Sequence, residues 1–151
     1  MSVQLTDDEA WQFVTDSTTA IVTTLRRDGF PVALPVWFVV VDREIYLRTP
    51  ERSKKVARVH QDDRAGVLVE SGERWAELKA VSFIARASVV ADDALHAQVL
   101  SLLAEKYRGR RQSRSTLPTD TVQHYASKEA VLRLTPAGNL LTWDNAKIRL
   151  A

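Results

Sequence analysis

Most strand-like segments of this chain follow one another across tight turns, and this order restricts the folds that the chain can adopt. Residues 18–25 are rich in β-branched side chains, and the dipeptide Asp28-Gly29 predicts a hairpin turn into a returning strand at 30–41. A third strand is expected at 44–49. Neighbouring strands joined by short turns are antiparallel, because parallel neighbours need a long crossover connection. The first third of the chain therefore predicts an antiparallel sheet.

The rest of the chain continues this pattern, with more strands and few helices. Strands are expected at 64–70 and 74–90, and a final hairpin is expected from 130–135 and 140–143. Helices are expected at 7–17, 53–60, 94–107 and 121–126. Because strands and helices do not alternate regularly, we predict a single domain (1–151) of mainly β (α+β) class, an antiparallel barrel with a few peripheral helices.

Local signals refine two of these elements. Thr6 and Glu9 have the spacing of a capping box, which predicts the start of the first helix. Pro35 cannot donate a ladder hydrogen bond, so the strand at 30–41 needs a bulge or an edge position. Trp37 and Phe38 are expected in the middle of this strand, where their side chains point to opposite faces.

Composition excludes several classes of function. The 151 residues include no cysteine, so disulfides, Cys-ligated zinc, iron–sulfur clusters and thiol catalysis are excluded. The three histidines lack metal-ligand spacing, and we expect no metal site. The longest apolar run, 36–41, is too short to cross a bilayer, and the N-terminus lacks an export signal pattern. We therefore expect a cytoplasmic protein without a membrane partner.

The segment 49–58 carries the clearest functional signal. A strand that leads directly into a helix presents free backbone N–H groups at which an anion can bind. Hydroxyl and cationic side chains gather at this turn: Thr49, Arg52, Ser53, Lys54, Lys55 and Arg58. The pattern indicates a phosphate site, although the cations could instead form one solvated helix face, and Thr49 could simply be a turn residue.

The run Arg108–Arg114 is the most basic segment of the chain. It could bind a polyanion, it could grip RNA or DNA, or it could be a solvated loop. No aromatic residues are interleaved with these arginines, which argues against single-strand recognition, and the formal net charge of only +2 adds no support for nucleic acid.

Several motifs in a fixed order resemble those of a known family. They are Pro31-x-x-x-Pro35-x-Trp37-Phe38, Thr49-x-x-x-Ser53-x-Lys55, Asp63-Arg64-Ala65, Val81-Ser82-Phe83-x-Ala85-x-Ala87 and Trp143-Asp144-x-x-Lys147. Together they resemble the pyridoxamine 5'-phosphate oxidase-like (FMN-binding) split β-barrel superfamily. Within it, the chain is most similar to the flavin/deazaflavin oxidoreductases that include actinobacterial coenzyme F420-binding proteins. The resemblance extends from about Thr6 to Lys147.

The resemblance implies a set of cofactor-binding residues. Thr49, Ser53 and Lys55 would bind the cofactor phosphate, with Arg52 and Lys54 beside them. The segment that would lie against the flavin-type ring comprises Pro35, Val36, Trp37 and Phe38. Members of the family are usually homodimers with the cofactor between subunits, and the segment with Trp143 and Lys147 would then close the site of the partner.

The implied function is hydride transfer from reduced F420 to a small organic acceptor. No Ser elbow, Walker loop or dinucleotide fingerprint is present, which fits an enzyme whose cofactor performs the chemistry. The preference for F420 over FMN rests on the Trp143–Lys147 ending and on the basic run. The alternatives are an FMN-binding pyridoxamine-phosphate-oxidase-like oxidoreductase, a non-catalytic F420 carrier and, ranked last, a nucleic-acid-binding barrel.

Overall fold

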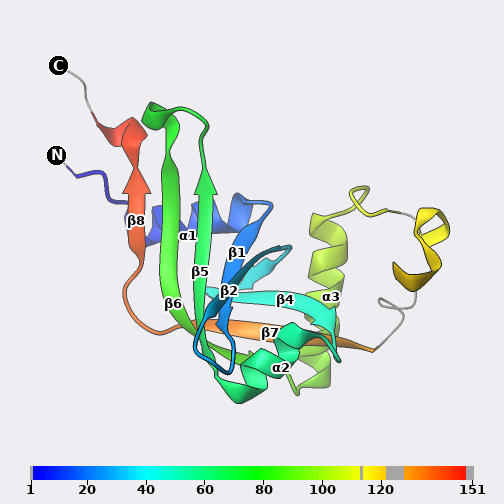
Figure 1. Ribbon diagram of the computed structural model, residues 1–151. Helices are drawn as coiled ribbons and strands as arrows, with labels where there is room; N and C mark the ends of the chain where they lie inside the picture. Colours follow the sequence, from blue (N-terminus) through cyan, green and yellow to red (C-terminus); the bar gives the residue numbers. More distant parts are fainter. Residues whose placement is uncertain (1, 113, 122–127, 149–151) are drawn as a thin grey trace.

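A computed structural model describes residues 2–112, 114–121 and 128–148 (Figure 1). The strands are β1 (Ala20–Leu25), β2 (Pro31–Val36), β3 (Val39–Val41), β4 (Glu44–Pro50), β5 (Arg64–Ser71), β6 (Lys79–Val89), β7 (Glu129–Pro136) and β8 (Leu141–Asp144). The helices are α1 (Asp7–Asp16), α2 (Lys54–Gln61) and α3 (Asp93–Lys106), with short 3₁₀ helices η1 (Trp75–Glu77), η2 (Arg114–Thr116) and η3 (Asn145–Lys147). The helix expected at 121–126 lies outside the described residues except for Thr121.

All strands belong to one antiparallel sheet with the order β2-β1-β5-β6-β7-β4-β3, and β8 pairs with β6. The strands at the two ends of this order, β2 and β3, are joined in the chain by Trp37 and Phe38 alone. Two residues span only a few ångströms each, so the sheet must curl until its ends nearly meet. The prediction of an antiparallel, barrel-like sheet with few peripheral helices is confirmed.

The segments 130–135 and 140–143, expected to form a hairpin, pair instead with the long strand β6. The two segments form strands β7 and β8 but do not pair with each other; both pair with the same edge of β6. Residues Lys79–Ser82 pair with β8, and Ala85–Val89 pair with β7. That expected hairpin is wrong, because an alternating pattern identifies a strand but does not identify its partner, and β6 is long enough to accept both.

The strand expected at 30–41 is also divided in two. Strand β2 ends at Val36 and β3 begins at Val39, so Trp37 and Phe38 lie between strands and not within one. Pro35 lies in β2, which pairs only with β1, so the expected edge position is confirmed. Phe38 is fully buried, and side chains from the end of α3 bind its backbone N–H and C=O groups in place of a strand ladder.

The core has two parts, which lie on opposite faces of the curled sheet. The larger part includes Val14, Phe38 and Leu47 and lies beneath α1 and α2. The smaller part packs α3 against β3, β4 and β7 through side chains such as Tyr46 and Leu103. Within the described residues, no helix is long and apolar enough to cross a membrane.

Candidate functional site

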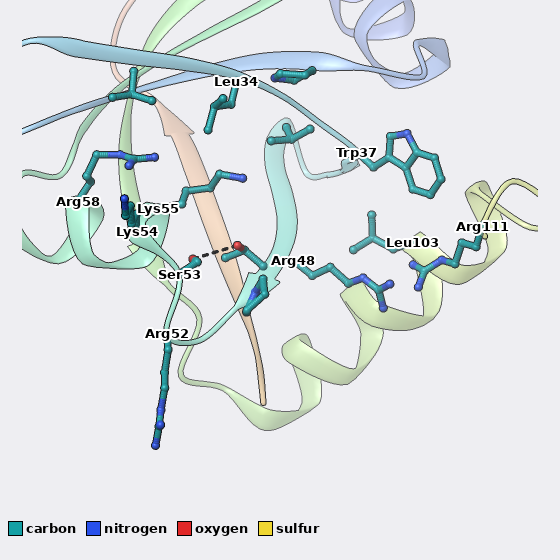
Figure 2. Close-up of a pocket in the computed structure, with 15 residues that line it drawn as sticks. Leu34, Trp37, Arg48, Arg52, Ser53, Lys54, Lys55, Arg58, Leu103 and Arg111 are labelled. Atoms are coloured by element: carbon teal, nitrogen blue, oxygen red, sulfur yellow. Dashed lines mark hydrogen bonds between the residues drawn. The ribbon is translucent and has the colours of Figure 1, made fainter. Parts of the chain in front are cut away.

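A groove of about 790 Å³ lies between β2, the segment from β4 to α2, and the end of α3 (Figure 2). Its apolar lining comes mainly from β2 and α3: Val32, Leu34, Pro35, Val36, Trp37, Pro50 and Leu103. Its polar lining comes mainly from β4 and α2: Arg48, Thr49, Arg52, Ser53, Lys54, Lys55, Arg58 and Arg111. An apolar wall therefore faces a cationic one.

Hydroxyl groups organise the start of α2. Ser53 is the N-cap, and its Oγ accepts a hydrogen bond from the backbone N–H of Val56 at 3.3 Å. The buried Thr49 donates from Oγ1 to the same Ser53 oxygen at 3.1 Å. The backbone N–H groups of Lys54 and Lys55, the first two of the helix, have no hydrogen-bond partner among the described residues. They are free to donate to an anion, as the first N–H groups of a helix commonly do.

The groove has a strongly positive lining. Six arginine and lysine side chains line it, and no Asp or Glu of the described residues does. Arg48 pairs with Glu129 just outside the lining at 3.3 Å, and Arg58 donates from Nε to Thr24 Oγ1 at 2.7 Å. In Figure 2, the Lys55 ammonium points into the groove and the Arg52 guanidinium points away from it.

Lys55 is a lining cation whose surroundings disfavour its charged form. Partial burial, and then the positive charge of Arg58, lower the pKa of Lys55 below its ordinary value. No described carboxylate compensates its charge. A bound anion would supply the missing partner, because an opposite charge nearby favours the protonated form.

The end of α3 forms the far wall of the groove. The Trp37 indole stacks on Tyr107, with ring centroids 4.3 Å apart and planes 3° from parallel. Tyr107 itself is buried, and its hydroxyl accepts a hydrogen bond from Phe38 N at 2.9 Å. Arg111, from the basic run, also lines the groove. Sequence reasoning did not assign Tyr107 to the site, although it lies four residues after the buried Leu103 and so shares its helix face.

Most of the sequence-predicted site residues lie together in this groove. They are Pro35, Val36, Trp37, Thr49, Arg52, Ser53, Lys54 and Lys55. Phe38 lies behind the wall and is fully buried. Its backbone C=O, which could have faced a ring, accepts a hydrogen bond from Lys106 Nζ at 3.0 Å.

Trp143 and Lys147 lie outside the groove of their own chain. Trp143 is half exposed on β8, and its indole N–H donates to the buried amide of Asn145. Lys147 donates from Nζ to Glu9 at 2.7 Å and to the carbonyl of Gln4 at 3.1 Å. Their expected place over the site of a second subunit stays a prediction.

The lining limits the chemistry that the groove can perform. Its titratable side chains are all cations, so no carboxylate or imidazole is placed there to act as a general base. The described residues also include no cluster of His, Asp and Glu suited to a metal ion. The groove can bind an anionic ligand and orient an apolar ring, and any redox chemistry must come from the ligand.

Comparison with solved structures places the chain among related folds. It is 26% identical to the conserved hypothetical protein Rv2991 of Mycobacterium tuberculosis, with a TM-score of 0.81 over 97% of this chain and 90% of the other. A FAD-binding protein of Mesorhizobium loti is 15% identical, with a TM-score of 0.70 over 92% and 94% of the two chains. A structure named F420 reductase is 14% identical, with a TM-score of 0.60 over 84% and 92%. The last two likenesses show a shared fold.

The comparison of sequences identifies the family. A search of curated proteins finds no significant match. The family model of pyridoxamine 5'-phosphate oxidase matches residues 6–140, which is most of the chain. The curled antiparallel sheet and its few helices agree with this match. The chain belongs to the pyridoxamine 5'-phosphate oxidase family, and its fold is the split β-barrel.

Proposed function

We propose that this protein is an oxidoreductase that binds a flavin-type cofactor, with F420 favoured over FMN, and transfers hydride to a small organic acceptor. The observation that carries the proposal is the anion site at the start of α2. Two free backbone N–H groups, the Ser53 hydroxyl and the Lys55 ammonium converge there without a lining carboxylate. This set of donors matches the needs of a cofactor phosphate group.

The rest of the groove fits the ring of such a cofactor. Its volume lies within the range of small-molecule sites, roughly 300–1,000 Å³. Among the described strands, β2 pairs only with β1, so its outer backbone groups are available to hydrogen-bond a heterocycle. Val36 and Trp37 would supply apolar contact. A bound deazaflavin or flavin supplies the hydride chemistry, and the protein supplies binding, orientation and electrostatics.

The preference for F420 rests on charge. A single phosphate, as in FMN, is satisfied by the groups at the start of α2. The lining carries six cations in all, Arg111 of the basic run among them, and this excess of positive charge suits a ligand with further acidic groups such as the glutamate tail of F420. The similar structures named as a FAD-binding protein and an F420 reductase support a cofactor of this kind.

We also propose that the protein is a homodimer of single-domain subunits. Ile84 on β6 and Leu141 and Trp143 on β8 are 66%, 72% and 49% exposed. The sheet register places these side chains on one face, since Leu141 pairs with Ser82 and Trp143 with Ala80. An apolar face of this kind is suited to association with a second copy. In such a dimer, the segment with Trp143 and Lys147 would close the groove of the other subunit.

The experiment that tests the function is a titration of the purified protein with F420 and, separately, with FMN. Tryptophan fluorescence reports binding because Trp37 lines the groove, and equilibrium dialysis gives the stoichiometry. We expect micromolar or tighter F420 binding that depends on Lys55, and weaker FMN binding. If FMN binds tightly and F420 cannot displace it, the deazaflavin assignment is wrong. Binding of neither ligand would refute the flavin-type function.

A second measurement separates an enzyme from a cofactor carrier. Reduced F420 is mixed with the protein and a panel of quinone-like and unsaturated acceptors, and its oxidation is followed by absorbance. Oxidation that requires both protein and acceptor supports the oxidoreductase. Tight binding without turnover of any acceptor would instead favour the non-catalytic carrier, which the groove also allows because it contains no side-chain acid or base.

A further inference from the structure

A second depression adjoins the groove beside α2. Its volume is about 500 Å³, and its polar lining consists of Arg26 and Arg27 from the β1–β2 turn and Lys54, Arg58 and Gln61 from α2. We call the four cations, Arg26, Arg27, Lys54 and Arg58, the turn subsite. Val32, Lys54 and Arg58 also line the groove, so the two depressions lie side by side and share these side chains.

Like the groove, the turn subsite has cationic side chains in its lining and no described carboxylate. The whole chain has 21 basic and 19 acidic residues, yet no described Asp or Glu lines either depression. Arg26 pairs with Asp28 at 3.0 Å on the exposed turn. Arg27 and Lys54 have no hydrogen bond or ion pair among the described residues through their side chains. Charges of one sign held together in a hollow repel each other and attract an anion from solution.

A single phosphate bound at the start of α2 would leave the positive charge of the turn subsite uncompensated. Lys54 and Arg58 are four residues apart in α2 and therefore share a helix face. The β1–β2 turn with Arg27 lies beside them in the second depression. Cationic side chains thus extend from the phosphate site along α2 to the β1–β2 turn. Their total charge is more than a single phosphate can neutralise.

We propose that the turn subsite binds a second anionic group, a phosphate or a carboxylate, of the same ligand whose first phosphate lies at the start of α2. This inference rests on the proposed function and deepens it. The ligand is a small molecule with several anionic groups, such as a deazaflavin with an acidic tail, and a mononucleotide with one phosphate leaves the turn subsite empty.

A small ligand suits the site better than a nucleic acid strand. The cationic side chains line depressions of about 790 and 500 Å³, and these volumes are typical of small-molecule sites. No aromatic side chain of the described residues lines the turn subsite, whereas proteins that bind single strands usually stack bases on aromatic rings. Nucleic acid is therefore an outcome that the experiment must exclude.

The test compares two ligands that differ only beyond the first phosphate: F420 with its glutamate tail, and the same deazaflavin ending in a single phosphate. Calorimetry gives the Kd of each for the wild-type protein and for the double variant Arg26→Gln/Arg27→Gln. Both arginines are exposed, so the variant should fold normally, and its thermal melting curve checks this. The matched control is Arg43→Gln, because Arg43 is also an exposed arginine but lines neither depression.

We expect the double variant to bind the tailed ligand roughly 2- to 30-fold more weakly, the combined effect expected for two exposed ion pairs, with the single-phosphate ligand unaffected. Equal weakening of both ligands, or no weakening of the tailed one, overturns the proposal. The proposal is also overturned if Arg111→Gln loses the preference for the tailed ligand over the single-phosphate ligand and the double variant keeps it. The tail would then lie at the opposite end of the groove.

A second probe separates failure of this inference from failure of the proposed function. If neither deazaflavin binds the wild-type protein, the flavin-type function fails. Pyrophosphate and triglutamate are then titrated alone: binding that the double variant loses supports the turn subsite as an oligoanion site, and no binding overturns it. A single-stranded oligonucleotide that binds more tightly than these probes, and loses affinity in the double variant, would replace the small ligand with nucleic acid.

Discussion

The indole of Trp37 stacks on the ring of Tyr107, with centroids 4.3 Å apart and planes only 3° from parallel. Trp37 belongs to the two-residue connection that joins the end strands of the sheet, and Tyr107 caps the C-terminal end of α3. The stack therefore connects Trp37, in the wall of the groove, to α3, the helix that packs against β3, β4 and β7. This relationship explains how a short connection between strands can present a defined aromatic surface.

The Tyr107 hydroxyl and ring should make separable contributions to stability. Tyr107→Phe keeps the ring but removes the acceptor for the backbone N–H of Phe38, which becomes buried and unpaired. We expect a loss of about 1–3 kcal/mol in the free energy of unfolding, with the fluorescence of Trp37 preserved. Tyr107→Leu should also change that fluorescence, because it removes the stacking partner. Urea unfolding and emission spectra check both variants, and identical spectra for the two would contradict the role of the ring.

Replacement of Lys55 by methionine should weaken cofactor binding without destabilising the free protein. The methionine keeps the partly buried stem and removes the charge that faces the groove. The expected loss in binding free energy is about 1.5–3 kcal/mol, the usual range for a hydrogen bond to a charged group. Calorimetry with F420 or FMN measures it, with Arg43→Gln, an exposed arginine outside the groove, as the control. Unchanged affinity in the Lys55 variant would refute the phosphate site.

The affinity for the cofactor phosphate should decrease as pH rises. Burial, and then the charge of Arg58, lower the pKa of Lys55, so the free protein loses this proton at a lower pH than an ordinary lysine would. Only the protonated form attracts the phosphate, and the affinity should fall as pH passes through that lowered pKa. Lys55→Arg should bind with a flat profile, because a guanidinium stays protonated. Parallel profiles for the two proteins would assign the effect to another group.

Lys106 should make the stability of the protein increase with pH in the alkaline range. Burial lowers its pKa to about 8, although the negative charge of Asp16 acts in the opposite direction. The unfolded chain keeps the proton up to the ordinary value of 10.5, so above pH 8 it binds more protons than the folded protein, and stability rises with pH.

The measurement for Lys106 is the urea unfolding free energy between about pH 8 and pH 10, compared with that of Lys106→Met. The upper limit avoids titration of Tyr107, whose pKa burial raises from 10.0 and whose contribution to stability falls with pH above that value. The rise should be smaller in the methionine variant. Equal slopes in both proteins would show that Lys106 does not titrate in this range.

A charge on the exposed sheet face should dissociate the proposed dimer. Ile84 is 66% exposed on that face, and burying a glutamate there against a second copy would leave an unpaired charge. Sedimentation velocity should show a dimer for the wild-type protein and a monomer for Ile84→Glu, with weaker F420 binding by the monomer. Phe30→Glu is the matched control, since Phe30 is 68% exposed at the β1–β2 turn. A monomeric wild-type protein would end the proposal.

Local signals in the sequence determined most of the secondary structure. The capping box at the start of α1 is confirmed: Glu9 N donates to Thr6 Oγ1 at 3.2 Å, and Thr6 N donates to the Glu9 carboxylate at 2.8 Å. The Asp28-Gly29 turn is confirmed as well, with Gly29 at a φ of +85° that glycine readily adopts. The N-cap Ser53 begins α2 where the phosphate pattern requires it. These features depend on residues a few positions apart, so the sequence contains the information directly.

Only the tertiary structure decided which strands pair and which side chains meet in the groove. The sequence predicted β7 and β8 as strands but did not identify β6 as their common partner. It also did not show that the strand expected at 30–41 is interrupted at Trp37 and Phe38. The hydrogen bond between Phe38 and Tyr107 joins residues 69 positions apart. Such contacts depend on how the whole sheet curls and buries its apolar face, a non-local balance that no short stretch of sequence specifies.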